Sequence, residues 1–159
     1  MSAADPTLTA LTATNGSVQL LTFKLDDQEY ALNIADVMQV VRMVAVTRAL
    51  KAPIFVEGMI NLRGRVIPVV SLRQRCGLTD RPYDLNTQLL IARAGGRLMA
   101  LMVDVVSEVL MIPDDCIEPP NQIGADMQHL SAVGKLGDRL ILILDPRSLL
   151  SDEAAAALN

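Results

Sequence analysis

The chain contains few aromatic residues: its 159 residues include 2 Phe, 2 Tyr and no Trp. A hydrophobic core must therefore be aliphatic, and enrichment in β-branched residues favours strands over helices. Hydrophobic residues still make up 51% of the chain, which excludes a disordered protein. A chain of this length fits one ordinary domain or two small lobes that share a core.

Residues that carry enzymatic chemistry are also scarce. His129 is the only histidine and lies in a polar stretch, so no second histidine is available to hold a metal ion. Cys76 and Cys116 have the spacing of neither a metal site nor a disulfide framework, and we interpret them as small buried apolar residues. Gly95-Gly96 lacks the lysine of a phosphate-binding loop. We therefore predict no catalytic activity, no metal and no cofactor.

Long apolar runs and basic leaders are absent as well. The most apolar long stretch, 98–112, is interrupted by Asp104 and Glu108, short of the roughly 20 apolar residues that span a bilayer. The first basic residue is Lys24, so no secretory leader precedes an apolar segment. The net charge of −4 and the lack of aromatics among the arginines at 63–81 disfavour nucleic acid as a partner. We predict a cytoplasmic protein that does not insert into membranes.

A strand followed by a short helix is predicted near the middle of the chain. The apolar run 66–70 is typical of a buried strand. Ser71 lies three residues before Gln74, the spacing of a capping box in which each side chain bonds the other's backbone N–H. A helix over 72–76 that ends at Gly77 is therefore expected.

Turn-forming residues divide the rest of the chain into short strands. The strands we expect cover 18–25, 29–34, a third ending near 46, 87–93, 98–103, 105–112, 130–136 and 139–144. Hairpin tips are predicted at 26–28, at Gly95-Gly96 and at Gly137-Asp138. Residues 53–57 predict a helical turn that stops at Gly58, and Asp145 predicts the cap of a C-terminal helix. Residues 78–86 read as a linker and 113–128 as a long loop.

The sequence repeats itself twice over. Residues 30–41 match 99–110 at a constant offset (99 − 30 = 69), and 62–73 match 136–147 at another (136 − 62 = 74). Short strands in two matching halves favour two small closed β-barrels, because closure removes exposed strand edges. We expect the lobes to meet around 78–86, with the two glycine hairpin tips in the second lobe.

The tract N-L-R-G-x-x-I-P-V-V-x-L-R, preceded by F-V-x-G, resembles the central motif of the CheW coupling proteins of bacterial chemosensory systems. The matching residues are Phe55, Val56, Gly58, Asn61, Leu62, Arg63, Gly64, Ile67, Pro68, Val69, Val70, Leu72 and Arg73. The resemblance extends over about 18–150. It implies an all-β fold of two five-stranded SH3-like β-barrels packed across a hydrophobic groove, with short helical turns. Residues 1–17 are then a mobile tail and 151–159 a C-terminal helical tail.

The same resemblance implies an adaptor that links the cytoplasmic hairpin tips of chemoreceptors to the histidine kinase CheA, whose regulatory domain shares the fold. Carried over by position, the receptor-binding groove would hold Val37, Gln39, Val40, Gly58, Arg63 and Val109. For the valines, burial in a barrel core is the alternative interpretation. Relatives usually carry Glu at the position of Gln39. The resemblance places that position beside Arg63, so we predict a hydrogen bond between the two side chains.

Two other functions remain open on the sequence. The chain could be the coupling protein of pilus-driven motility or of another chemosensory-like kinase pathway, because no residue separates these from chemotaxis. More remotely, it could be a small all-β enzyme or a ligand-binding domain, although no catalytic constellation supports that reading. Binding to a receptor fragment and to the kinase, set against a screen for hydrolase activity, separates the adaptor from the enzyme.

Overall fold

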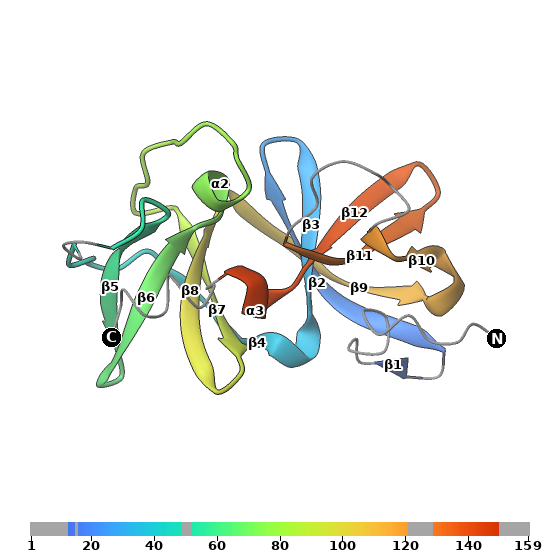
Figure 1. Ribbon diagram of the computed structural model, residues 1–159, viewed down its shortest axis with the longest axis horizontal. Helices are drawn as coiled ribbons and strands as arrows, with labels where there is room; N and C mark the ends of the chain where they lie inside the picture. The colour runs from blue at the N-terminus through green and yellow to red at the C-terminus, as the bar shows by residue number, and fades with distance from the viewer. Residues whose placement is uncertain (1–12, 15, 49–51, 121–128, 150–159) are drawn as a thin grey trace.

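The computed structural model describes residues 13–14, 16–48, 52–120 and 129–149. Two curled β-sheets lie next to each other along the long axis of the molecule (Figure 1). Barrel A is the seven-stranded sheet: β1 (Ala13–Thr14), β2 (Ser17–Leu25), β3 (Gln28–Asn33), β9 (Val105–Pro113), β10 (Ile117–Glu118), β11 (Leu130–Leu136) and β12 (Arg139–Leu144). Barrel B is the five-stranded sheet: β4 (Val37–Arg42), β5 (Val56–Leu62), β6 (Arg65–Ser71), β7 (Gln88–Ala94) and β8 (Arg97–Val103).

The predicted all-β fold of two barrels is confirmed, and barrel A exceeds the expected five strands only by the two-residue strands β1 and β10. The described helices are short: η1 (Ile34–Asp36), α2 (Leu72–Arg75), η2 (Asp114–Cys116) and α3 (Pro146–Leu149). None of them has the length and apolar character needed to cross a bilayer. Strands β1, β2 and β10 also correct two expectations, because residues 13–14 and 17 lie in strands rather than in a mobile tail and 117–118 interrupt the expected loop.

The internal repeat is confirmed at the level of strands. Strand β5 and helix α2 recur as β11 and α3 at an offset of 74 residues (130 − 56 and 146 − 72), and β3 recurs as β8 at an offset of 69 (97 − 28). The parallel pairing of β6 with β8 and of β12 with β3 also keeps one register, since Val69 opposite Ala100 is equivalent to Ile143 opposite Ala31.

The two halves of the repeat do not form one lobe each, as the sequence suggested. Barrel A takes β2 and β3 from the first half and β9, β11 and β12 from the second, and barrel B takes the complementary set. The exchange occurs because Asn33 caps η1 by accepting the Ala35 N–H (2.9 Å), and the chain then leaves β3 to pair β4 with β7. Consequently 78–86 connects two elements on the barrel B side, and the confirmed hairpin tips Gly95-Gly96 and Gly137-Asp138 lie in different barrels.

Both barrels close by the same device. In barrel B, Thr47 forms a single bridge to Met59 of β5, and in barrel A, Glu118 of β10 pairs with Val133 of β11. Met59 and Val133 are equivalent in the repeat (133 − 59 = 74), so each β-hairpin is met at the same point by the segment that follows the long third strand. This short pairing replaces the open strand edge that the sequence analysis expected closure to remove.

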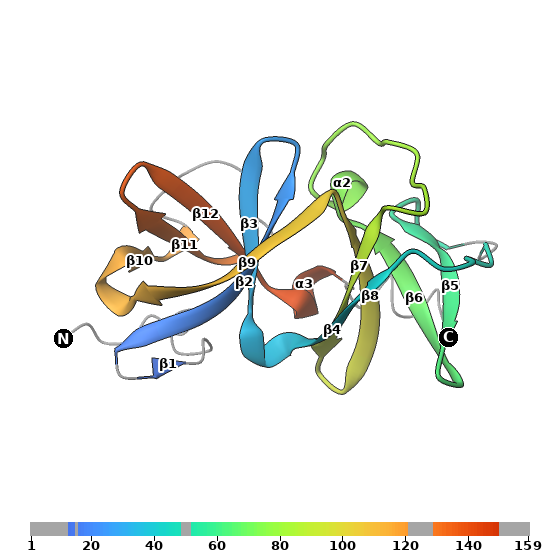
Figure 2. The same cartoon turned by 180° about the vertical axis from the view of Figure 1, so that it is seen from behind.

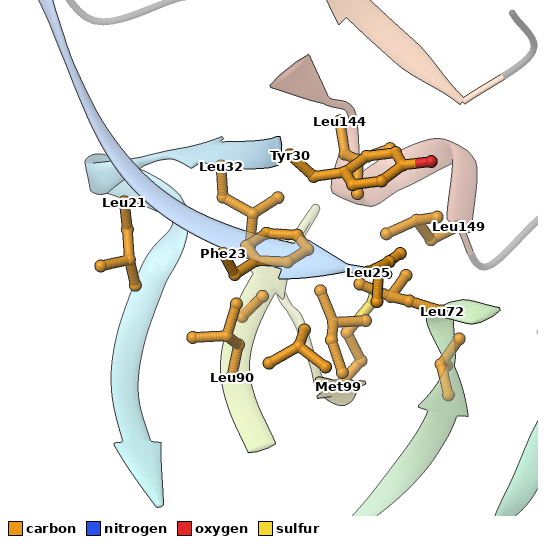
Figure 3. Close-up of a cluster of buried hydrophobic side chains, with 14 residues drawn as sticks. Leu21, Phe23, Leu25, Tyr30, Leu32, Leu72, Leu90, Met99, Leu144 and Leu149 are labelled. Atoms are coloured by element: carbon orange, nitrogen blue, oxygen red, sulfur yellow. The ribbon is translucent and has the colours of Figure 1, made fainter. Parts of the chain in front are cut away.

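Side chains fill three cores rather than two. Each barrel has its own interior core, and a central core lies between the barrels (Figure 3). The central core contains Leu21, Phe23, Leu25, Tyr30, Leu32, Val70, Leu72, Leu90, Ala92, Met99, Leu101, Val103, Leu144 and Leu149. Strand alternation produces this arrangement, because one face of β2 supplies Leu20 to the interior of barrel A and the other supplies Leu21 and Phe23 to the central core.

Two local predictions need correction. Residues 53–57 form no helical turn: the Val56 N–H donates to the Pro53 carbonyl (2.9 Å) in a tight turn, and Val56 already begins β5, which runs on through Gly58. The capping box at Ser71 is half formed. Its Oγ accepts the Gln74 N–H (3.3 Å), but the Ser71 N–H donates instead to Phe55 (2.7 Å).

The predicted C-terminal cap is present, since Asp145 Oδ1 accepts the Arg147 N–H (3.0 Å) at the start of α3. The predicted helical tail over 151–159 lies outside the described residues, as do residues 1–12 of the predicted N-terminal tail.

Candidate partner-binding site

The candidate groove residues lie on both barrels. Val37, Gln39 and Val40 belong to β4, and Val109 belongs to β9; both strands are in view in Figure 2. Val37 is half-buried and packs against the central core, so the core interpretation applies to it. Val40 and Val109 are exposed, with 39% and 52% of their surface accessible, and remain candidates for contact with a partner.

Val40 and Val109 are the same position in the two halves of the repeat (109 − 40 = 69). Val40 pairs with Leu90 of β7, and Val109 pairs with Leu21 of β2. Both leucines belong to the central core, so each valine lies on a strand next to the junction of the barrels. Exposed apolar neighbours on the same two strands are Met38, Val105 and Met111. Each barrel thus presents an apolar strand surface of the kind that marks interaction sites.

Gly58 is placed in β5, but it is buried. A Cβ atom there would lie 2.2 Å from the Thr47 carbonyl oxygen and 2.8 Å from a Val46 methyl group, and its φ of 156° is one that other residues rarely adopt. Glycine is therefore required by the strand that crosses it. The expectation that Gly58→Asp leaves the fold intact is wrong for this packing, because any side chain displaces the Thr47 bridge.

The hydrogen bond predicted between Gln39 and Arg63 is absent among the described residues. Gln39 lies opposite Ile91 in the middle of the β4–β7 pair, whereas Arg63 is exposed at the tip of the β5–β6 hairpin with a φ of 53°. Strands β4 and β5 are at opposite ends of the strand order of barrel B, which separates the two positions. The Asn61 carboxamide holds the tip by accepting the Gly64 N–H (2.9 Å).

An ion cluster between the barrels was not predicted. The buried Arg73 of α2 lies 2.8 Å from Asp26 Oδ1 in the β2–β3 turn and 2.8 Å from Asp104 Oδ2, and its Nε donates to the Thr79 carbonyl (2.8 Å). Arg81 contacts the same two carboxylates at 3.2 and 3.1 Å. Sequence reasoning had placed Arg73 on a basic rim of a binding surface. The structure instead uses its guanidinium to tie the two barrels together.

The electrostatics of this cluster follow from its geometry. The hydrogen bond from Arg73 holds the pKa of Asp26 below its usual range, and the same contact raises the pKa of Arg73. Asp104 also accepts the Asp26 backbone N–H (2.8 Å), which fixes the β2–β3 turn against the segment that leaves β8. A polar pocket of about 210 Å³ opens beside the cluster and is lined in part by Tyr83 and Thr87. The cluster sets the relative placement of the two barrels and hence of the two apolar strands.

The remaining chemical candidates take structural roles. His129 Nδ1 lies 2.7 Å from Ser148 Oγ, and the Asp145 N–H donates to the His129 carbonyl (2.8 Å), so the histidine helps to seat α3. Burial raises the pKa of the Cys76 thiol to about 11, consistent with a partly buried apolar role. In the described part of the chain, no three His, Cys, Asp or Glu side chains are grouped to hold a metal ion.

Two SH3-like barrels with a shared core and an apolar strand on each define a scaffold that meets other proteins through its surface. A family model described as the CheW-like domain matches residues 19–154. The chemotaxis protein CheW of Klebsiella aerogenes is 32% identical over 143 residues, covering 89% of this chain and 86% of that protein. The chemotaxis protein CheW of Rhizobium meliloti is also 32% identical, covering 91% and 94%.

A solved structure agrees with these relatives. The crystal structure of the scaffolding protein TtCheW from Thermoanaerobacter tengcongensis matches with a TM-score of 0.80 and 33% identity, covering 86% of this chain and 94% of that one. The chain belongs to the CheW family of chemotaxis scaffold proteins.

Proposed function

We propose that this protein is a non-catalytic adaptor that couples the cytoplasmic hairpin tips of chemoreceptors to the histidine kinase CheA. The family match over 19–154 and the relatives that are named chemotaxis proteins support this assignment. On this proposal the protein works in the cytoplasm and reaches membrane receptor arrays through its protein partners. The relatives' names favour chemotaxis over pilus-driven motility as the pathway.

The observation that carries the receptor-binding part is the pair of exposed, equivalent valines. Val40 on β4 and Val109 on β9 present apolar surface from one strand of each barrel. A receptor hairpin is a pair of amphipathic helices, and such helices bind by placing apolar anchors against an apolar surface. One helical hairpin that lies across the junction can contact both strands, which is why two equivalent surfaces suit a single partner. Gln39, Arg63 and the buried Gly58 belong to this proposal as supporting positions.

The test is the affinity of the full chain for a purified receptor cytoplasmic fragment, measured by calorimetry, with Val40→Asp and Val109→Asp as variants. We expect each aspartate to weaken binding by about tenfold or more, because a charge must be desolvated against the apolar anchors. Stimulation of the kinase by the receptor should fall in parallel. Thermal unfolding should change little, since both side chains are exposed.

Leu85→Asp is the matched control, because Leu85 is 81% exposed, apolar and in the linker outside the candidate surface. It should bind the receptor fragment like the native chain. Equal binding by all three variants would refute the valine surface. A native chain that binds neither receptor nor kinase would refute the adaptor function itself.

A further inference from the structure

The interior of barrel A is capped at one end by a cluster of three charged side chains. Arg139 donates to both carboxylate oxygens of Glu29 (Nε 3.0 Å, terminal nitrogen 2.7 Å) and to Glu108 (3.0 Å). Each of the three lies two residues before a residue of the interior core, and alternation along a strand puts them on that same inward face. The hydrogen bond from Arg139 holds the pKa of Glu29 below its usual range. The arginine position therefore has a demonstrated ligand in this fold, namely two carboxylates.

Barrel B has the same position without the carboxylates. At offsets of 74, 69 and 69 residues from Arg139, Glu29 and Glu108, the equivalent residues are Arg65, Leu98 and Gln39.

The equivalence is supported by strand pairing. Gln39 lies opposite Ile91, and Glu108 lies in the β9 segment opposite Thr22, which accepts the Glu108 N–H (3.2 Å) and donates to its carbonyl (3.0 Å); Ile91 and Thr22 are again 69 residues apart. Leu98 packs against the interior core of barrel B, as the side chain at this position should. The two clusters are therefore the same site with different residues.

Arg65 is left exposed by this change. Within the described residues it has no hydrogen bond or ion pair, and its neighbour Val66 is 65% exposed. An apolar side chain cannot accept its hydrogen bonds, and a neutral amide offers one oxygen where a carboxylate offers two. Arginine binds a carboxylate by two parallel hydrogen bonds, as Arg139 does with Glu29.

We propose that Arg65 binds an aspartate or glutamate side chain of the chemoreceptor hairpin, and that Gln39 and Leu98 keep it free for that carboxylate. This inference rests on the adaptor function proposed above and adds a residue that decides which hairpins are accepted. The hairpin must carry an acidic residue beside its apolar anchors. Gln39 is then a positioning residue: its neutral amide avoids an internal ion pair that would compete with the partner.

The experiment measures the affinity of the receptor cytoplasmic fragment for Arg65→Ala, Gln39→Glu and the double variant, with Arg139→Ala as the matched control. We expect Arg65→Ala to weaken binding by about tenfold, the range of one charge-assisted hydrogen-bonded contact. Gln39→Glu should weaken binding by a similar factor, because it rebuilds the barrel A ion pair within barrel B. In the Arg65→Ala background the glutamate should have no further effect.

Thermal unfolding supplies a readout that does not depend on any partner. Gln39→Glu should raise the unfolding temperature only when Arg65 is present, whereas Arg139→Ala should lower it and leave the affinity unchanged. Native affinity in Arg65→Ala, or additive effects in the double variant, would overturn the inference and leave the adaptor function standing. Failure of the native chain to bind the receptor fragment would overturn both.

Discussion

The interiors of the two barrels are near copies of each other, whereas the two faces that meet in the central core are unlike. Leu20 and Ala31 in barrel A correspond to Leu89 and Ala100 in barrel B, and all four are fully buried. Each barrel must fill a small closed space of the same shape, and so it uses the same side chains.

The central core follows a different rule. Barrel A contributes Phe23 and Tyr30, whose rings stack with centroids 6.1 Å apart, and barrel B contributes Ala92 and Met99 at the equivalent positions. Two surfaces that pack against each other must be complementary, so a large side chain on one requires a small or flexible one on the other. Barrel identity thus resides at the junction and at the surface rather than in the barrel interiors.

The largest effect is expected from removing the aromatic side of the junction. Phe23 is fully buried, and Phe23→Ala should cost about 3–5 kcal/mol of unfolding free energy, because the opposing Ala92 cannot fill the cavity. Chemical denaturation followed by circular dichroism measures the loss. A cost below about 1 kcal/mol would mean that the junction repacks and that its asymmetry has no structural weight.

The equivalence of the interiors is tested by a matched pair of substitutions. Leu20→Ala and Leu89→Ala should each cost about 2–5 kcal/mol, and the two values should agree to within about 1 kcal/mol. Both leucines have no accessible surface and occupy the same repeat position. A large difference between the two denaturation curves would show that one barrel interior tolerates a cavity better than its copy.

Two strand glycines distinguish the barrels further. Gly58→Ala should cost about 1–3 kcal/mol, because its Cβ would meet the Thr47 carbonyl at 2.2 Å. Gly134→Ala in barrel A is the control, since there the nearest atom, at 3.1 Å, is the terminal methyl of the Ile112 side chain, which can move. Thermal unfolding should rank Gly58→Ala as clearly less stable, and equal unfolding temperatures would argue against the close crossing at Thr47.

The smallest effect concerns acid stability. The pKa of Glu29 is lowered in the folded protein by its hydrogen bond to Arg139, so this contact stabilises the fold above the ordinary pKa of 4.5 and is lost as the pH falls through the lowered value. Arg139→Gln should remove about 0.5–1 kcal/mol at neutral pH and flatten the decline in stability below pH 4.5. Arg65→Gln, its equivalent in barrel B, should leave the pH profile unchanged. Denaturant titrations across acidic pH compare the two variants.

The sequence allowed the strands, the glycine hairpin tips and the repeat to be predicted, because apolar alternation and turn residues act locally. It did not reveal which strands share a barrel. A repeat offset such as 69 states that Val40 and Val109 are equivalent, but not that each pairs with the other half of the chain. The capping box at Ser71 failed on its second bond for the same reason, since Phe55 takes the Ser71 N–H from outside the local segment.

The candidate site was predictable only in part. Val40 and Val109 are exposed as a binding surface requires, whereas burial of Gly58 depends on the crossing at Thr47, which no local pattern signals. Arg73 was recognisable as the equivalent of Arg147, but its carboxylate partners Asp26 and Asp104 come from other parts of the chain. Long-range pairing of this kind follows from the assembled fold and not from spacing.

The exchange of strands between the halves also sets an order for folding on the ribosome. All strands of barrel B lie between Val37 and Val103, so barrel B can assemble from one continuous segment. Barrel A needs β3 to pair with β12, as in Ala31 opposite Ile143, and its first hairpin must wait until nearly the whole chain has been synthesised. Contacts between such distant residues form slowly, because a long loop has to be closed first. While it waits, the apolar hairpin of β2 and β3 can rest only on the central core face of the finished barrel B, which makes the later-completed barrel dependent on the earlier one as a template.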